Sequence, residues 1–102
     1  MKSKRTKALS ISPKVRQAVI ERHNGRCLLC GDVGTDIAHY LSRGAQGGLG
    51  IEQNLVLLCR DCHFRLDQTT ERKSLLIAVK HYLEAIYPGF RDEDRRYDKW
   101  RS

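Results

Sequence analysis

The sequence predicts an α+β protein in which two short strands and a short helix form one unit held together by a four-cysteine site. Three observations lead to this prediction. Two Cys-x-x-Cys pairs are separated by 28 residues. Short apolar runs bounded by turn residues lie between the pairs, and one longer run at helical spacing follows them. We therefore expect this central unit to have one helix on its N-terminal side and one on its C-terminal side.

The length and composition indicate a single globular domain. The chain has 102 residues, of which 40% are hydrophobic and 30% are charged. Its longest apolar runs, residues 55–59 and 75–79, are far too short to cross a membrane, which takes about 20 residues. No apolar signal-peptide segment follows the basic N-terminus. We therefore expect a cytoplasmic protein without membrane partners, in which cysteines favour metal ligation over disulfides.

The net charge of +7 is unevenly distributed along the chain. Residues 1–26 carry +7, residues 27–70 carry −2 and residues 71–102 carry +2. A basic segment beside an acidic centre is typical of a protein that binds phosphate groups and a cation. A solvated, disordered basic tail is the other interpretation of the same charge run.

The sequence predicts that the chain consists of three segments. Residues 1–11 lack periodicity, and we expect a flexible basic arm. A single domain should span residues 12–90, with its core unit at 26–68, and residues 91–102 read as a charged C-terminal tail. The first helix of the domain should begin at Pro13 with Ser12 as its N-cap, and Asn24 with Gly25 should end it.

The core unit and the helix after it follow from local patterns. Residues 36–41 alternate, which predicts a strand with Ile37, His39 and Leu41 on one face and Asp36, Ala38 and Tyr40 on the other. A glycine-rich loop at 44–50 precedes a second, nearly all-apolar strand at 54–58. A short helix should run from about Arg60 to Gln68. A longer helix at 71–87 carries one apolar stripe and ends at Pro88 and Gly89; the stripe comprises Leu75, Leu76, Val79, Tyr82, Leu83 and Ile86.

The two cysteine pairs predict a structural zinc site. A two-residue spacer lets each pair present both sulfurs to one tetrahedral ion. Zinc binding worth on the order of 10 kcal/mol would stabilise a core that is otherwise small for its chain length. The expected ligands are Cys27, Cys30, Cys59 and Cys62.

The four histidines are not equivalent. His39 lies within the first strand, just before the glycine loop. His63 directly follows a cysteine, and Asp67 lies one helical turn later on the same face, so both side chains can bind one cation. We expect His23, at a helix C-terminus where positive charge is favourable, to be ordinary, and His81, off the apolar stripe, to be a surface residue.

The order of these residues resembles the HNH endonuclease family, whose core is the ββα-metal finger. The likeness is strongest to the small four-cysteine members common in bacteriophages and bacteria. Ile37-Ala38-His39-Tyr40-Leu41-Ser42-Arg43-Gly44 is similar to the first motif. Gln53-Asn54-Leu55-Val56-Leu57-Leu58-Cys59-Arg60-Asp61-Cys62-His63 is similar to the second and third. The resemblance covers about residues 26–67.

The resemblance implies a metal-dependent nuclease that nicks or cuts duplex DNA with little sequence selectivity of its own. His39 would be the general base, a neutral imidazole needing no special burial. His63 and Asp67 would hold a divalent cation such as Mg²⁺ or Mn²⁺. Asn54 would bridge backbone groups and hold the base-bearing strand, and Arg43 would contact the scissile phosphate. The family's products carry a 5′-phosphate and a 3′-hydroxyl.

The sequence departs from the family pattern at one position. Many members have Asp or His directly before the base histidine as a further metal ligand, and this chain has Ala38. Because Asp36 shares a strand face with Ala38, we expect Asp36 to reach the cation directly or through water. Without it, His63 and Asp67 alone would hold the cation loosely.

Two other interpretations remain open at this point. The chain is alternatively a zinc-stabilised nucleic-acid-binding module without catalysis. Its basic arm would bind phosphates together with the C-terminal residues Arg95, Arg96, Tyr97, Lys99, Trp100 and Arg101. As an interaction adaptor, it would present an unpaired apolar stripe on the helix over 75–86. By analogy with the family, a nuclease of this size works alone or beside a larger phage or bacterial protein such as a terminase.

Overall fold

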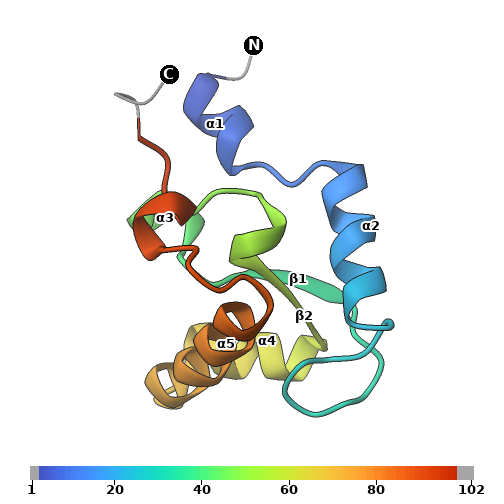
Figure 1. Cartoon of the computed structure of the whole chain (residues 1–102). Coiled ribbons are helices and arrows are strands. Elements are labelled where there is room, and N and C mark those ends of the chain that lie inside the picture. The colour runs from blue at the N-terminus through green and yellow to red at the C-terminus, as the bar shows by residue number, and fades with distance from the viewer. Residues whose placement is uncertain (1–2, 99–102) are drawn as a thin grey trace.

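A short antiparallel pair of strands forms the centre of the molecule. The computed structural model describes residues 3–98. Strand β1 (Asp36–His39) pairs with β2 (Leu55–Leu58), with Asp36 opposite Leu58 and His39 opposite Leu55 (Figure 1). The two predicted strands are therefore confirmed, but the first is shorter than the expected 36–41. It ends at His39 because the backbone of Leu41 bonds to a side chain instead of to the neighbouring strand.

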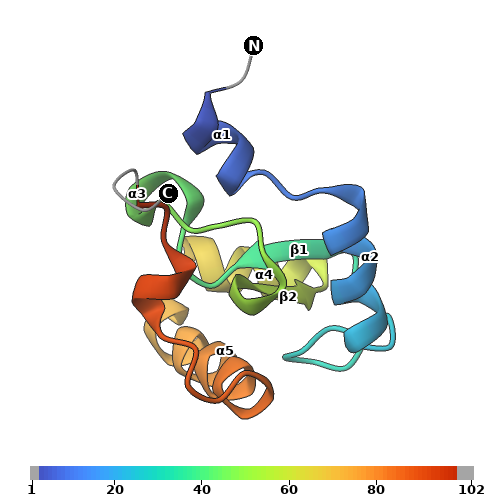
Figure 2. The ribbon, with the colours of Figure 1, turned by 45° about the horizontal axis from the view of Figure 1, so that its top comes forward.

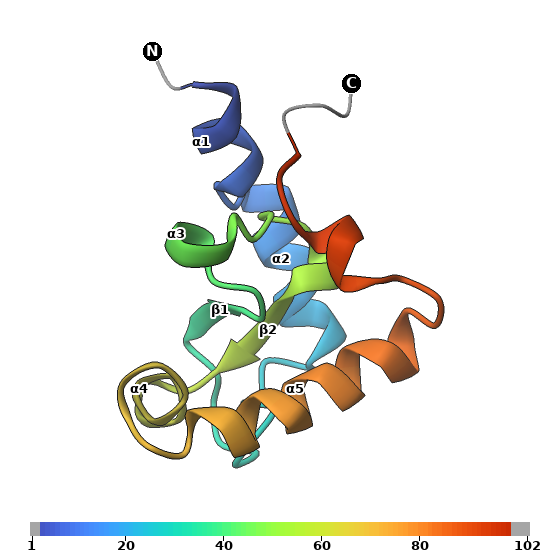
Figure 3. The ribbon, with the colours of Figure 1, turned by 90° about the vertical axis from the view of Figure 1, so that its left-hand side faces the viewer.

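The side chains of β2 alternate between two small cores. Val56 and Leu58 pack in the core formed with α4 (Arg60–Gln68) and α5 (Arg72–Ile86). Leu55 and Leu57 pack with α2 (Pro13–Arg22) on the opposite face. In Figure 3 the helices α4 and α5 lie on the side of the strands away from α2. Burial on both faces explains why the second strand is apolar at every position.

The predicted flanking helices are confirmed. Helix α2 begins at Pro13, and the hydroxyl of Ser12 accepts a hydrogen bond from the backbone N–H of Val15 at 3.1 Å. On α5, Val79 and Leu83 are fully buried against the core. Leu75, Leu76 and Tyr82 pack against the same core, whereas Ile86 is exposed, so most of the stripe that the adaptor interpretation requires is covered within the chain.

The N-terminal segment is not a flexible arm throughout. Residues Lys4–Leu9 form helix α1, capped by the side chain of Ser3, and Leu9 is only 1% exposed. The backbone N–H of Gly50 donates to the carbonyl of Ala8 at 3.0 Å. The expectation over 1–11 is wrong at these residues because α1 is fixed by tertiary contacts with the glycine loop, which local periodicity does not reveal.

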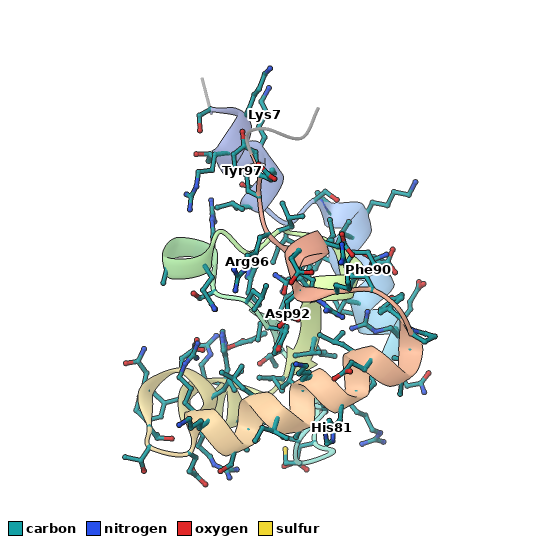
Figure 4. The ribbon with its side chains drawn as sticks, turned by 60° about the vertical axis from the view of Figure 1, so that its left-hand side comes forward. Lys7, His81, Phe90, Asp92, Arg96 and Tyr97 are labelled. Atoms are coloured by element: carbon teal, nitrogen blue, oxygen red, sulfur yellow. The ribbon has the colours of Figure 1, made fainter. Side chains whose placement is uncertain are left out.

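The C-terminal segment likewise belongs to the folded unit. Residues Asp92–Arg95 form the 3₁₀ helix η2, and Arg95 is buried. Beyond it, the backbone N–H of Tyr97 donates to the carbonyl of Gly47 at 2.8 Å. Figure 2 shows this segment running beside the short helix α3 (Arg43–Gln46), and in Figure 4 Tyr97 lies near Lys7 of α1. The expected charged tail is thus wrong up to residue 97, while Lys99, Trp100 and Arg101 lie outside the described residues.

The loop at 47–50 lies between the two ends of the chain. It donates to Ala8 on one side and pairs with residues 95–97 on the other. A Cβ atom at residue 48 would lie 1.8 Å from the carbonyl oxygen of Leu41. Glycine is required there for close backbone approach. Among residues 3–98, the structure contains no helix long and apolar enough to span a membrane.

Candidate active site and metal centre

The four cysteines gather at one point, as the sequence predicts. Their sulfur atoms all lie within 4.8 Å of one another, and those of Cys30 and Cys59 are 3.6 Å apart. Sulfurs bound tetrahedrally at about 2.3 Å from one ion are separated by about 3.8 Å. The cluster therefore has the ligand set and the dimensions to hold a structural metal ion.

Two turns position these sulfurs. The backbone N–H of Gly31 donates to the carbonyl of Cys27 at 3.0 Å, which closes the first Cys-x-x-Cys turn. Cys59 is the N-cap of α4, and its sulfur accepts from the N–H of Cys62 at 3.4 Å. Burial raises the pKa of the Cys27 thiol, but backbone N–H groups, foremost that of Cys59, outweigh it and lower this pKa to about 7. This shift favours the thiolate form at Cys27, whereas burial raises the pKa of the Cys62 thiol in the same cluster.

A cleft of about 220 Å³ opens between β1, α3 and α4. It brings together four residues that the sequence singles out: His39, Arg43, His63 and Asp67. The remaining lining residues are Ile37, Ser42 and Arg72. The predicted base and the predicted cation ligands therefore face one solvent-accessible space.

The imidazole of His63 lies between two carboxylates. Its Nδ1 is 2.9 Å from Oδ2 of Asp36, and its Nε2 is 3.1 Å from Oδ2 of Asp67. Asp36 also accepts from Nε of Arg60 at 3.1 Å, and its side chain is 14% exposed. The hydrogen bond with His63 is the largest cause that lowers the pKa of Asp36. Asp36 is therefore an ionised anchor for the ring.

The pair formed by His63 and Asp67 fits a divalent cation. Ligand atoms 3.1 Å apart can both reach one ion at about 2.1 Å from each. Asp36 contacts the opposite edge of the imidazole, so its oxygens are not beside an ion at Nε2. This geometry does not favour direct ligation of that ion by Asp36, and its contact through water stays a prediction. A carboxylate at the second ring nitrogen instead orients a metal-binding histidine. Ala38 is buried in the core.

His39 is the last residue of β1 and is half-buried in the wall of the cleft. Its Nε2 lies 3.3 Å from the backbone carbonyl oxygen of Leu9. Burial, followed by the charge of Arg43, lowers the pKa of His39 below its ordinary value, although the contact with Leu9 opposes this shift. The sequence predicts a neutral imidazole without special burial; the ring is neutral at neutral pH, and burial reinforces that state.

Asn54 forms the bridge that the resemblance implies. Its side chain is fully buried; Oδ1 accepts from the N–H of Leu41 at 2.9 Å, and Nδ2 donates to the carbonyls of Leu41 and Leu49 at 3.2 and 3.0 Å. These three bonds join the end of β1 to the end of the glycine loop. Asn54 therefore fixes the backbone that follows His39 and does not line the cleft.

Two arginines that support Asn54 were not predicted in this role. Nη1 of Arg22 donates to the carbonyl of Glu52 at 2.8 Å, and Nε of Arg95 donates to the carbonyl of Gln53 at 2.7 Å. The assignment of Arg95 to phosphate binding is wrong, because this residue is 1% exposed. No local pattern distinguishes such an arginine from a surface one, since its partners are backbone carbonyls far away in the sequence.

Comparison of the sequence with protein-family models gives no match, and comparison with curated proteins gives none either. The groups that line the cleft therefore indicate what it can do chemically. A neutral imidazole can accept a proton, the imidazole–carboxylate pair of His63 and Asp67 can hold a cation, and the exposed guanidinium of Arg43 can bind an anion. Together these groups suit hydrolysis of a phosphate ester.

Proposed function

We propose that this protein is a metal-dependent DNA endonuclease or nickase of the HNH type, with zinc in its four-cysteine site. One observation carries the proposal: His39 and the pair of His63 and Asp67 line a single cleft of about 220 Å³. A base and a cation site facing the same space can act on the same phosphorus atom.

His39 acts as the general base. Its neutral imidazole accepts a proton from a water molecule, and the water oxygen attacks the phosphorus of a phosphodiester. The bond between phosphorus and the 3′-oxygen breaks, and the departing oxygen takes a proton from solvent water. The products are a 5′-phosphate and a 3′-hydroxyl, and the lowered pKa of His39 keeps the base form populated at neutral pH.

His63 and Asp67 hold the divalent cation, Mg²⁺ or Mn²⁺. When bound, this ion supplies charge stabilisation for the phosphate oxygens and the departing 3′-oxygen. Asp36 fixes the orientation of the His63 ring through Nδ1. Arg43 donates to the phosphate from the rim of the cleft.

The partner is duplex DNA, bound largely through its phosphates. The positive charge of residues 1–26 supports this assignment. Lys4, Arg5 and Lys7 are exposed on α1, and α1 contacts the glycine loop through Ala8. A larger phage or bacterial protein, such as a terminase, and a cytoplasmic location remain predictions from the sequence.

The test compares two histidine variants. Supercoiled plasmid is incubated with the purified protein and Mg²⁺ or Mn²⁺, and nicked and linear forms are quantified. His39→Ala should reduce the cleavage rate at least 100-fold, whereas His81→Ala, exposed on α5, should leave it unchanged. Equal cleavage by wild type and His39→Ala would contradict the catalytic assignment.

A second candidate is a zinc-stabilised nucleic-acid-binding module without turnover. It is favoured by the pairing of both carboxylates that contact His63 with arginines: Asp36 with Arg60 at 3.1 Å and Asp67 with Arg72 at 3.4 Å. These pairs neutralise the carboxylates without a cation. The candidates differ in Mn²⁺ binding by the zinc-loaded protein, which the nuclease requires and Asp67→Asn should weaken.

A further inference from the structure

Two adjacent residues of the N-terminal segment contact both cleft residues that the proposed function places nearest the substrate. The carbonyl oxygen of Leu9 lies 3.3 Å from Nε2 of His39. The hydroxyl of Ser10 accepts from Nη2 of Arg43 at 3.4 Å. Both contacts come from outside the strand–loop–strand–helix unit and span about 30 residues of sequence.

We propose that residues 8–10 are a positioning element of the active site, which fixes the tautomer of His39 and the direction of Arg43. The Leu9 carbonyl accepts the hydrogen of Nε2, and Nδ1 of His39 is left as the atom that takes a proton from water. The role of Nδ1 rests on the proposed nuclease function, whereas the assignment of the tautomer is independent of that function.

The chemistry of the contact allows one tautomer. A neutral imidazole carries hydrogen on only one of its nitrogens, and a backbone carbonyl can only accept. With hydrogen on Nδ1 instead, the lone pair of Nε2 would face the oxygen of Leu9 in a half-buried setting. The hydrogen bond that one ring nitrogen makes sets which nitrogen is free to act.

The glycine loop holds this segment in place. The N–H of Gly50 donates to the Ala8 carbonyl at 3.0 Å. A Cβ atom at residue 50 would lie 2.1 Å from the oxygen of Ser10 and 3.0 Å from that of Leu9. Gly50→Ala must therefore displace the backbone that carries the Leu9 carbonyl. At Gly44, in the helix α3 that precedes this loop, a Cβ atom would meet no atom within 4 Å, so Gly44→Ala is a control.

The decisive experiment reads the tautomer directly. In the full-length, zinc-loaded chain labelled with ¹⁵N-histidine, long-range ¹⁵N–¹H correlation identifies the protonated nitrogen of each ring. We expect His39 to carry its hydrogen on Nε2 in the wild type and in Gly44→Ala. Gly50→Ala should shift the ring toward the other tautomer or a mixture. Hydrogen on Nδ1 of wild-type His39, or an unchanged ring in folded Gly50→Ala, would overturn the proposal.

Two further arms complete the test. If Gly50→Ala does not fold, Ser10→Ala in the full-length chain replaces it, because this change removes the hydroxyl that accepts from Nη2 of Arg43. Ser10→Ala should lower the cleavage rate, and a rate equal to that of the wild type would overturn the role of Ser10. In plasmid cleavage, Gly50→Ala should lower kcat about tenfold or more, as misplaced catalytic groups do, with little change in KM. Absence of cleavage by the wild type would refute the nuclease function, while the tautomer measurement would still decide the positioning role.

Discussion

At the scale of single residues, the site depends on how each charged group is oriented by its neighbours. His63 is fixed at both ring nitrogens, by Asp36 at 2.9 Å and by Asp67 at 3.1 Å. The two carboxylates have different tasks, because they lie on opposite edges of the ring. Asp67 faces the cleft and can share an ion with His63, whereas Asp36 sets the orientation of the ring.

This division of roles predicts the effect of Asp36→Asn. The amide keeps the shape of the side chain but removes the charge that favours hydrogen on Nδ1 of His63. The Mn²⁺ concentration needed for half-maximal plasmid cleavage should rise about tenfold or more, with the zinc content unchanged. Asp61→Asn, at an exposed position of α4, is the control. An unaltered Mn²⁺ requirement in Asp36→Asn would show that the Asp36 contact does not support the cation site.

His23 predicts a pH dependence of stability. Its ring stacks on Tyr82 with centroids 4.8 Å apart, and burial, followed by the charge of Arg22, lowers its pKa from 6.5 to about 4. His23 is therefore not the ordinary histidine expected from the sequence, because its surroundings in the folded chain disfavour the charged form.

Proton linkage makes the folded chain less stable as the pH falls. As the pH falls below about 6.5, the unfolded chain protonates this histidine while the folded chain does not, so the free energy of unfolding decreases down to about pH 4. Denaturant titrations between pH 7 and 5 should show a shallower decrease for His23→Gln than for the wild type. His81→Gln should follow the wild type, and identical slopes in all three proteins would count against the shift.

At the scale of elements, the glycine loop is where the two ends of the chain meet the central unit. Residue 50 bonds to Ala8 in the last turn of α1, and residues 47–49 bond to residues 95–97. The buried side chain of Arg95 also joins these segments. Its guanidinium donates to the carbonyls of Gln53 and Phe90 and to Asp92, and it lies 5.7 Å from the ring centroid of Tyr40.

Arg95→Lys tests this element. A lysine ammonium lacks the planar fork needed to reach three acceptors at once. We expect the variant to lose about 3 kcal/mol in the free energy of unfolding. Arg96→Lys changes the exposed neighbour and should cost no more than about 0.5 kcal/mol. Similar losses in both variants would mean that the buried guanidinium does not hold the loop.

The elements that the sequence predicted are those defined by local signals. Ser12 and Pro13 mark the start of α2, the spacing of Val79 and Leu83 marks α5, and the two cysteine pairs mark the metal centre. Helix α1 and the helix η2 were missed because their stability comes from contacts with residues about 40 positions away.

The candidate site shows the same division. The shared cleft of His39, His63 and Asp67 followed from motif order and from the resemblance, as did the bridging role of Asn54. The position of Asp36 at Nδ1 did not follow, since strand alternation gives the face of a residue but not the ring edge it contacts. The contact of the Leu9 carbonyl could not be predicted either, because every residue has a backbone carbonyl and the residue type does not show which one makes a contact.

At the scale of the whole molecule, one metal centre and one loop organise a small fold. The four-cysteine site joins the turn at 27–30 to the start of α4, and α4 carries His63 and Asp67. The loop and the two chain ends hold β1 and His39 on the facing side. Under the proposed function, the ion at the cysteines is structural and the ion at His63 and Asp67 is catalytic, so the two should be separable by their affinity and their ligands.

The catalytic cation is tested most directly by measuring metal content and cleavage in the same samples. The purified protein is treated with a chelator under conditions that leave tightly bound zinc in place, and plasmid cleavage is assayed before and after Mg²⁺ or Mn²⁺ is restored. We predict about one zinc per chain throughout, cleavage that disappears on chelation, and cleavage that returns with the added ion in the wild type but not in His39→Ala. Cleavage that persists without the added ion, or that no divalent ion restores, would contradict a catalytic cation at His63 and Asp67.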